Sequence, residues 1–383
     1  MSNESRVIIV QRIFPAYRKP IFDAIYRKIG FDLLHSRNSS GIKQTSAPYS
    51  VQIRKWQYGK GDTSLFLDVF GIIKKKKPKV IIHEMAVGIV SLPLVLIGRK
   101  LFGYRLVLWG HTYNRKAGFN PRKSWGDKYR LWLQRKADAI ITYSIGEKQV
   151  LMENHVKGDK IFPALNTLDT NRYFPIRNRL EELGKETVKQ NLGFKHKYNL
   201  IFIGRLYEDK WPEVAIEVLG CLHNMGLTSV GLHFVGTGPM EMPIRVYAQE
   251  AGITDHVFYR GEIYDENRTG ELLFASDLMI MPGCVGLSVN HAFCFNCPVV
   301  TFESKDHVPA HGPEIEYIIN GKTGFVTPSR DVKKMASIVF DYLDNEELQQ
   351  QTKSHIRNMI EQICPIGKLV DGFVNAIDYV SKK

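Results

Sequence analysis

Short apolar runs alternate with longer segments of helical periodicity along most of this chain. The runs are rich in Val, Ile and Leu and rarely alternate polar with apolar residues, which is typical of parallel strands buried on both faces of a sheet. In the first half we expect strands at Arg6–Gln11, Phe31–His35, Val80–His83, Arg105–Trp109 and Ala139–Tyr143, with helices such as Lys19–Lys28 and Lys128–Lys136 between them. This order of elements predicts β-α-β units and an α/β fold.

A second series of the same kind begins near Lys197. Its expected strands are Asn199–Ile203, Gly231–Val235, Val257–Tyr259, Leu278–Met281 and Val299–Phe302, and its expected helices are Glu213–Met225, Met240–Ala251, Gly270–Phe274 and Val289–Phe295. The polar stretch Asn166–Lys195 contains Pro175 and is interpreted as a connection between two domains. The end of the chain, Glu346–Tyr379, is helical by its period.

These patterns divide the 383 residues into two doubly wound domains, which agrees with the usual domain size. We expect an N-terminal domain at 1–168, a connection at 169–196, a second domain at 197–365 and a helix at 366–383 that crosses back to the first domain. Open parallel sheets bind ligands at the carboxyl ends of their strands. Two such domains that face each other are expected to enclose a cleft there.

Composition excludes several classes of protein. Hydrophobic residues make up 44% and charged residues 24% of the chain, which is ordinary for a globular protein and excludes disorder, collagen and coiled coils. Five cysteines are too few for a disulfide scaffold, so a reducing compartment is expected. The first residues have no signal-peptide core, and no apolar run is long enough to cross a membrane. We therefore expect a cytoplasmic protein.

The net charge of +13 is unevenly distributed. Residues 1–150 hold 28 Lys and Arg against nine Asp and Glu, whereas the remainder is mildly acidic. A basic half indicates an anionic partner, which could be lipid, nucleic acid or a phosphorylated acceptor. No nucleic-acid-binding motif accompanies the charge, so nucleic acid is not expected. The run Lys74–Lys79 could equally be a solvated loop, and the apolar stretch Met85–Gly98 is either a buried helix or a helix at a membrane surface.

Three segments of the second domain have residues suited to a phosphorylated ligand. Gly204 and Arg205 follow an expected strand, and Lys210 comes five residues later at a helix start, where cations and N–H groups suit phosphate. Gly236 and Gly238 follow the next strand and allow close approach of a ligand. A glycine-rich turn then leads into a helix, so the N–H groups of Gly286, Leu287 and Ser288 could contact a diphosphate. Each signal is weak alone.

As an ordered set, these segments resemble the retaining glycosyltransferases of family 4, group 1, which have the GT-B fold of two Rossmann-like domains facing across a cleft. The resemblance covers Lys197–Pro328. It rests on Arg205 with Lys210, on Val235–Pro239, on Gly261 after the next strand, and on the spacing from Glu316 to Gly321. The segments Asn166–Thr170 and Trp109–Thr112 are similar to the family's interdomain segment and to its post-strand His segment. The shortened loop 282–287 is similar to a subset found among surface-polysaccharide transferases.

The resemblance implies site residues. Arg205 and Lys210 would neutralise the departing diphosphate, His111 would lie beside the donor sugar, and Glu316 would bind its hydroxyls. The family usually has two Glu residues around the donor loop, and this chain differs at both positions. The first Glu is missing, and His291 stands in place of the second, which usually binds ribose. The N-terminal glycine loop is also absent, and Arg18 or Lys19 would instead face the acceptor or a phosphate.

The implied activity is transfer of a sugar, with retention, from a nucleotide sugar (UDP- or GDP-linked) to a hydroxyl of a lipid-linked saccharide in surface-polysaccharide synthesis. No metal or other cofactor is expected, and the anionic inner face of the membrane is the expected partner surface. The pair Cys294 and Cys297 lacks further zinc ligands and is interpreted as structural. Two alternatives stay open: another GT-B-like enzyme, such as an epimerase or phosphorylase, or a non-catalytic subunit that binds a sugar nucleotide.

Overall fold

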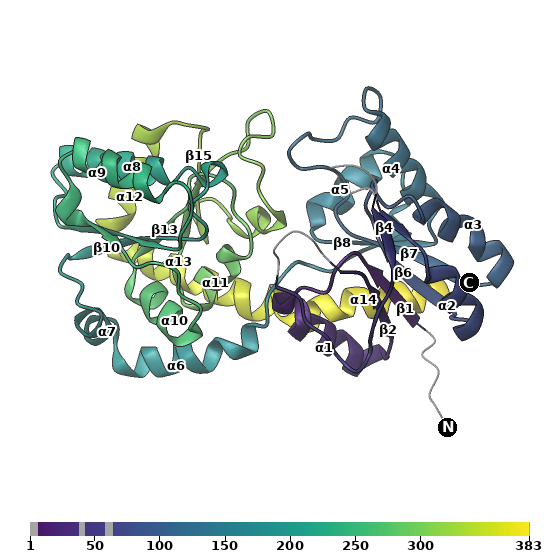
Figure 1. Ribbon diagram of the computed structural model, residues 1–383. Helices are drawn as coiled ribbons and strands as arrows, with labels where there is room; N and C mark the ends of the chain where they lie inside the picture. The colour runs from purple at the N-terminus through teal and green to yellow at the C-terminus, as the bar shows by residue number, and fades with distance from the viewer. Residues whose placement is uncertain (1–6, 38–42, 58–63, 383) are drawn as a thin grey trace. The chain divides into compact units, whose positions relative to one another are not determined.

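The computed structural model describes residues 7–37, 43–57 and 64–382 (Figure 1). The chain forms two compact units. The N-terminal unit comprises Met1–Leu168 together with Ile366–Lys383, and the C-terminal unit comprises Asp169–Pro365. Among the described residues, no helix has both the length and the apolar character that crossing a membrane requires.

The N-terminal unit is built on a parallel sheet of seven strands in the order β3-β2-β1-β6-β7-β8-β9. These strands are β1 (Val7–Gln11), β2 (Asp32–His35), β3 (Ser50–Gln52), β6 (Val80–Glu84), β7 (Arg105–Trp109), β8 (Ala139–Thr142) and β9 (Ile161–Pro163). An antiparallel pair, β4 (Lys55–Gln57) and β5 (Ser64–Phe66), stands apart. All five predicted strands are present, although Arg6 lies outside the described residues. The four strands of three residues were not predicted.

Helices cover both faces of this sheet, because alternate strand residues point to opposite sides. Ile9 and Ile82 join one buried cluster with α1 (Lys19–Ile29) and α14 (Ile366–Ser381). Ile8 and Ile81 join a second cluster with α2 (Val69–Lys76), α3 (Leu92–Phe102), α4 (Trp125–Lys136) and α5 (Ile145–Glu153). The doubly wound arrangement predicted for this half is therefore present.

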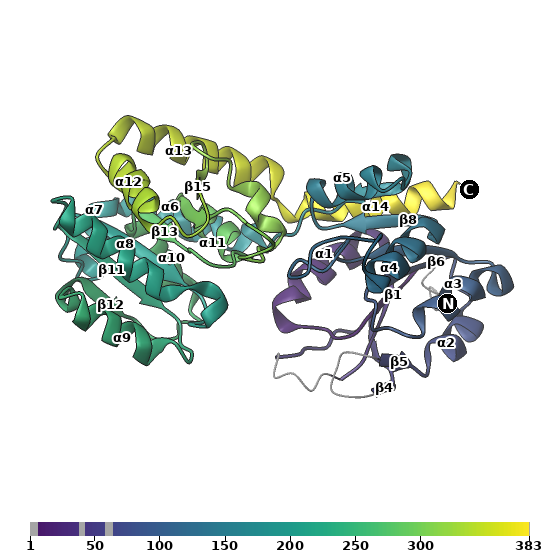
Figure 2. The same cartoon turned by 90° about the horizontal axis from the view of Figure 1, so that it is seen from above.

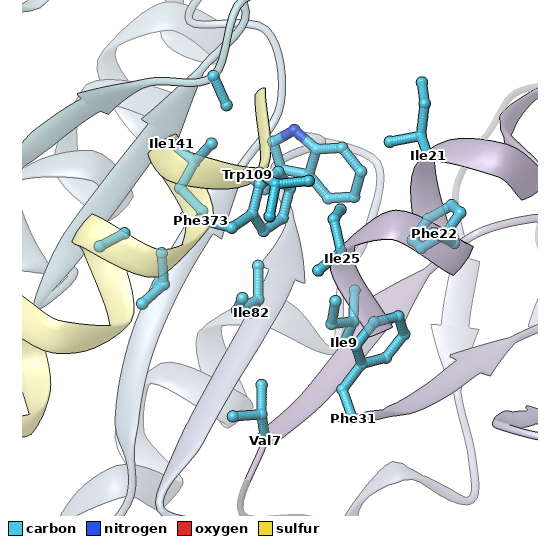
Figure 3. Packing of buried hydrophobic residues seen from close by; sticks show 14 of the residues in the cluster. Val7, Ile9, Ile21, Phe22, Ile25, Phe31, Ile82, Trp109, Ile141 and Phe373 are labelled. Atoms are coloured by element: carbon cyan, nitrogen blue, oxygen red, sulfur yellow. The ribbon is translucent and has the colours of Figure 1, made fainter. Parts of the chain in front are cut away.

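The last helix, α14, completes the first of these clusters although it lies more than 190 residues beyond residue 168 in the chain. Phe373 is fully buried and meets the ring of Trp109 edge-on, with centroids 4.7 Å apart (Figure 3). Figures 1 and 2 both show α14 running beside α1 in the N-terminal unit. The N-terminal unit is therefore closed by the C-terminal end of the chain.

The C-terminal unit has a parallel sheet of six strands in the order β12-β11-β10-β13-β14-β15. They are β10 (Tyr198–Ile203), β11 (Val230–Val235), β12 (Val257–Tyr259), β13 (Leu278–Ile280), β14 (Val299–Phe302) and β15 (Gly324–Thr327). Its helices include α8 (Pro212–Asn224), α9 (Glu241–Glu250), α10 (Glu266–Ala275), α11 (Ser288–Cys294), α12 (Val332–Leu343) and α13 (Glu346–Asn358). Every predicted strand and helix of this half is present, and β15 is an addition.

The segment expected as a polar connection contains two helices, α6 (Phe174–Leu183) and α7 (Lys185–Asn191). Pro175 lies in the first turn of α6, where its missing N–H needs no partner. Both helices pack on α10, and the buried Arg177 pairs with Glu361 at 2.6 Å. These contacts make residues 174–191 part of the C-terminal unit.

Candidate functional site

Two glycine-rich loops lie together at the carboxyl edge of the C-terminal sheet. The N–H of Gly204 donates to the carbonyl of Val235 at 2.9 Å, and the N–H of Leu206 donates to that of Thr237 at 2.9 Å. A Cβ on Gly236 would overlap the carbonyl oxygen of Gly204, and one on Gly238 would overlap that of Leu206. The two loops can therefore lie this close only because these positions are glycine.

Gly261 supports the same edge from β12, because its carbonyl accepts the N–H of Gly236 at 2.8 Å. The loops after β10, β11 and β12 are thus connected by backbone hydrogen bonds. This is the edge at which parallel α/β sheets bind ligands.

Lys210 connects the loop after β13 to the loop after β10 through hydrogen bonds. It ends a short 3-10 turn, Glu208–Lys210, and its Nζ donates to the carbonyl of Cys284. In return, the N–H of Gly283 donates to the carbonyl of Lys210 at 3.1 Å. Burial lowers the pKa of Lys210, and the nearby positive charge of Arg205 acts in the same direction. Arg205 itself is exposed, with its guanidinium carbon 5.0 Å from the ring centre of Tyr207. The edge therefore has two cations.

Gly286, Leu287 and Ser288 lead from the β13 loop into α11. Among the described residues, no backbone carbonyl accepts the N–H groups of these three residues. A Cβ built on Gly286 would meet no atom within 4 Å, so the space beside it is open. Backbone donors, open space and the two cations at one strand edge together form a site that suits an anionic ligand.

Two carboxylates, Glu314 and the predicted Glu316, follow this loop in the chain, and they differ in burial. Both belong to the 3-10 helix Pro313–Tyr317, whose three-residue turn places Glu314 inward and leaves Glu316 exposed. The side chain of Glu314 is buried, and its Oε2 lies where a Cβ on Gly312 would be. Gly312 is bound to the loop through its N–H, which donates to the carbonyl of Val285 at 2.8 Å.

His291 lies one turn into α11 and packs between two aromatic rings. Its ring centre is 4.8 Å from that of Tyr173 and 5.8 Å from that of Phe295. Burial lowers the pKa of His291 to about 4, and its Nε2 is buried without a hydrogen-bond partner among the described residues. A neutral ring with an unused polar nitrogen can bond a ligand hydroxyl.

The thiols of Cys294 and Cys297 are buried, and burial raises the pKa of both. Within the described ranges no group of three or more His, Cys, Asp or Glu side chains could hold a metal ion. Burial outweighs the nearby cations in both cases, so the two thiols are neutral and contribute to packing between α11 and β14.

The N-terminal unit has its own cavity, of about 330 Å³, at the carboxyl ends of β1, β6 and β7. Arg12 and Glu84 form an ion pair along its wall, with Nη2 2.7 Å from Oε1, and the same carboxylate accepts the N–H of Arg12 at 2.7 Å. The other lining residues are Gln11, Ile13, Pro15, Tyr17, Arg18, Lys55, Ser64, Met85, Gly110, His111 and Tyr143. The cavity is polar and contains more cations than anions.

Of the two cations predicted near this position, Arg18 lines the cavity. Its Nη1 donates to the hydroxyl of Tyr143 at 2.9 Å, and its guanidinium carbon lies 5.8 Å from the ring centre of Trp109. Lys19 instead pairs with Asp23 at 2.7 Å along α1, and it is not among the lining residues. Arg18 precedes α1, whereas Lys19 is its first residue. This difference of one position directs the side chain of Lys19 away from the cavity.

His111 lines the cavity and is oriented by a buried carboxylate. Its Nδ1 is 2.9 Å from Oε1 of Glu147, which also accepts from Arg115 at 3.1 Å. The other oxygen of Glu147 accepts the N–H of Tyr143 at 3.0 Å. An Nδ1–H that donates to Glu147 leaves Nε2 of the ring as an acceptor for a ligand.

Sequence reasoning missed Glu147, Arg12 and Glu84. A signal for Glu147 was available, because Ser144 followed three residues later by Glu147 is the pattern of a helix N-terminus. Ser144 Oγ indeed accepts the N–H of Glu147 at 3.1 Å at the start of α5. The pattern predicts where the helix begins. That His111 lies beside Glu147 follows instead from the pairing of β7 with β8.

Comparison with known proteins identifies the C-terminal unit. The sequence model of the family described as "Glycosyl transferases group 1" matches residues 184–359, which include the Arg205, Lys210, Gly236 and Gly286 segments. This part of the C-terminal unit is therefore similar to glycosyltransferase group 1 domains. The chain is also 21% identical to the putative glycosyltransferase EpsD of Bacillus subtilis over 350 residues, covering 88% of this chain and 86% of that protein.

Solved structures show the fold. Anabaena Alr3699/HepE, crystallised in complex with UDP, matches with a TM-score of 0.69 at 15% identity, over 97% of this chain and 99% of that one. The lipopolysaccharide outer core galactosyltransferase WaaB, in its apo form, matches with a TM-score of 0.65 at 14% identity, over 98% and 99%. The chain therefore has the GT-B fold, with a parallel α/β sheet in each unit.

Proposed function

We propose that this protein is a retaining glycosyltransferase that moves a sugar from a UDP-sugar to a hydroxyl of a lipid-linked saccharide. One observation carries the proposal. Arg205 and Lys210 lie among hydrogen-bonded glycine-rich loops at the carboxyl edge of a sheet, in the part of the chain that matches the group 1 model. UDP is the first candidate because HepE was crystallised with UDP. GDP-sugars are the second.

Arg205 and Lys210 are assigned to the departing diphosphate. The bond from the sugar's anomeric carbon to the diphosphate oxygen breaks, and a bond from that carbon to the acceptor oxygen forms on the same face. The acceptor's proton passes to the leaving diphosphate. Negative charge grows on the diphosphate as the bond breaks, and cations fixed in place stabilise that charge without reorganisation. This role requires no metal ion.

The same loops are assigned to the donor. The N–H groups of Gly286, Leu287 and Ser288, at the start of α11, are assigned to the diphosphate, and the buried Glu314 is assigned to the sugar hydroxyls in place of Glu316. His291 is assigned to the ribose, because its Nε2 is buried and unpartnered among the described residues. A hydroxyl that bonds this nitrogen would satisfy it.

The cavity of the N-terminal unit is assigned to the acceptor. Arg18 offers a cation for a lipid-linked phosphate, and Nε2 of His111 offers an acceptor for a sugar hydroxyl. Lipid-linked saccharides carry phosphate, so a cationic cavity suits them. Synthesis of a surface polysaccharide at the inner face of the cell membrane is the proposed setting, and the activity named for WaaB supports it.

Thermal unfolding against UDP-, GDP-, ADP- and dTDP-sugars tests the donor site. A ligand at 100 times its Kd should stabilise the protein by about 2.7 kcal/mol. We expect one nucleotide class to do so, and Arg205→Ala to lose the shift and about 2.7–4 kcal/mol of transition-state stabilisation, by analogy with an oxyanion donor. The matched control is Arg268→Ala, which removes an exposed arginine of α10 paired with Glu271.

Full turnover by Arg205→Ala would refute the assignment of this residue. Analysis of the products separates the alternatives. A glycoside with an unchanged anomeric configuration supports the proposal. A free epimer or a sugar phosphate would indicate another GT-B-like enzyme, and donor binding without any product would indicate a non-catalytic subunit.

A further inference from the structure

Helices α2, α3 and α4 form one layer over the sheet face opposite α14 in the N-terminal unit. Their inward side chains share one buried cluster with β1, β6 and β7. The layer is tied together at its end, where Nη1 of Arg99 on α3 donates to the carbonyl of Lys136 on α4 at 2.8 Å. Figures 1 and 2 both show α3 and α4 beside one another, on the side of the sheet away from α14. The outward sides of α3 and α4 thus form one surface.

The outward side of α3 is apolar. Leu94, Ile97 and Leu101 are 51%, 63% and 80% exposed, whereas Leu92, Val95 and Leu96 of the same helix are buried. Residues three and four apart lie on one side of a helix, so the three exposed side chains form a single row. A helix on the surface of a water-soluble protein normally has polar residues on that side. This row is therefore an exposed apolar patch that needs an explanation.

The outward side of α4 combines tryptophans with cations. Trp125 is 82% exposed and Trp132 is 41% exposed, and Lys128, Arg135 and Lys136 are exposed beside them. Indole rings are enriched where hydrocarbon meets lipid headgroups, because they are apolar at one end and polar at the other. Basic residues on the same face add attraction to anionic lipid.

A hollow of about 640 Å³ opens between α4 and the turn after α5. Its lining includes the indole of Trp132 and the cations Arg122, Lys128 and Arg135, together with one carboxylate, Glu153. A phosphodiester headgroup could enter such a hollow beside the exposed indole of Trp132.

The charge of this layer is predominantly positive. Residues 69–136 contain 16 Lys and Arg but only two acidic residues, Glu84 and Asp127. The carboxylate of Glu84 forms an ion pair with Arg12 in the cavity. Asp127 is buried and pairs with Arg130 at 2.9 Å. Exposed lysines also end α2, at Lys74, Lys75 and Lys77. A partner that covers the apolar row must therefore be anionic as well as apolar.

We infer that the outward sides of α3 and α4 dock on an anionic lipid bilayer, with Leu94, Ile97, Leu101 and the two tryptophans entering the interface and the surrounding cations contacting the headgroups. A bilayer supplies both properties at once. A second copy of the chain fits less well, because two copies of this surface would bring lysines against lysines. The inference deepens the proposed function, since it places the enzyme where a lipid-linked acceptor lies.

Flotation of the full chain with vesicles tests the docking. Vesicles of phosphatidylcholine alone are compared with vesicles that also contain phosphatidylglycerol. We expect binding only to the anionic vesicles, weakened by salt. Ile97→Gln with Leu101→Gln should lower the partition coefficient by about tenfold or more, because two buried aliphatic side chains are lost from the interface. The control pair is Met242→Gln with Val246→Gln on α9, residues that are 68% and 49% exposed in the C-terminal unit.

A charge pair completes the design. Lys128→Gln with Arg135→Gln should reduce binding to anionic vesicles and flatten its salt dependence, whereas Lys333→Gln with Lys334→Gln on α12 should do neither. Wild-type protein that stays with the unbound fraction, or α3 variants that bind as well as wild type, would overturn the inference. So would a wild-type dimer that the α3 variants convert to a monomer while vesicle binding is absent.

The test separates docking from catalysis. The nucleotide-dependent thermal shift should be unchanged in the α3 variants, because α3 belongs to the N-terminal unit and the glycine-rich loops belong to the C-terminal unit. Nucleotide binding and transfer without vesicle binding would refute the docking alone. Vesicle binding without sugar transfer would refute the proposed function alone.

Discussion

Replacing Glu147 should show how strongly a buried carboxylate supports the N-terminal cavity. The side chain is 1% exposed and accepts hydrogen bonds from Nδ1 of His111, from Arg115 and from the N–H of Tyr143, at 2.9, 3.1 and 3.0 Å. Truncating one partner of a buried charge pair typically costs about 3–5 kcal/mol, so we expect Glu147→Ala to lower the free energy of unfolding by that amount. Glu147→Gln keeps an oxygen acceptor but loses the charge, and should cost about 1.5–3 kcal/mol.

The cost should depend on pH. Although burial acts to raise the pKa of Glu147, hydrogen bonding and charge from His111 and then Arg115 hold it below its usual range. The folded state therefore favours the carboxylate, and its stabilisation is complete above the unfolded pKa of about 4.3. As the pH falls through the lower folded pKa, that stabilisation is lost. Wild type and Glu147→Gln should then converge in stability.

Urea unfolding followed by circular dichroism measures the stability, and sugar transfer measures the effect on the cavity. Because Glu147 positions His111, we expect Glu147→Gln and His111→Ala to lower kcat and the double variant to be no worse than His111→Ala. Glu153→Gln, an exposed carboxylate of the same helix, is the control. A loss of stability below about 1 kcal/mol in Glu147→Ala would refute the reasoning, since that is the size of an exposed ion pair.

Three further outcomes follow from single contacts. Gly236→Ala should destabilise the protein by about 1–3 kcal/mol and abolish nucleotide binding, because its Cβ overlaps the carbonyl of Gly204, whereas Gly286→Ala should leave stability unchanged in the same thermal assay. Lys160→Met should cost about 3 kcal/mol in urea unfolding, since Nζ donates to three carbonyls at the end of α4; an unchanged midpoint would contradict this. Burial, together with the charge of Arg260, lowers the pKa of His233 to about 3, so the unfolded chain gains this proton first and stability falls by up to about 1.4 kcal/mol per unit as the pH drops from 6.5 to 3. His233→Phe should flatten that slope in unfolding measured across this range.

The long strands of both sheets could be predicted because their signal is local. β1, β7, β10 and β11 are runs of five or six residues that are mostly Val, Ile, Leu and Phe, and buried parallel strands require such runs. The three-residue strands β3 and β9, which were not predicted, are too short for a periodic signal, and each is formed by pairing with a longer neighbour. β15 begins at Gly324, which discourages a strand assignment.

The candidate site divides in the same way. Arg205, Lys210 and Gly236 follow predicted strands, so their meeting at one sheet edge could be expected from order along the chain. Glu314 and Glu316 are two residues apart, and only the phase of a 3-10 turn decides which one is buried. Arg18 and Lys19 differ by one residue, and the start of α1 decides which one lines the cavity.

The amino-acid sequence by itself determined the α/β class, the length and order of the main strands, and the carboxyl edge where the glycines and cations meet, because these depend on the residue's own neighbours in the chain. Only the tertiary structure decided that Glu147 holds His111, that α14 returns to bury Phe373 against Trp109, and that Leu94, Ile97 and Leu101 face outward. Those facts depend on which distant segments pack together, and an apolar row has the same sequence pattern whether it is covered or left exposed.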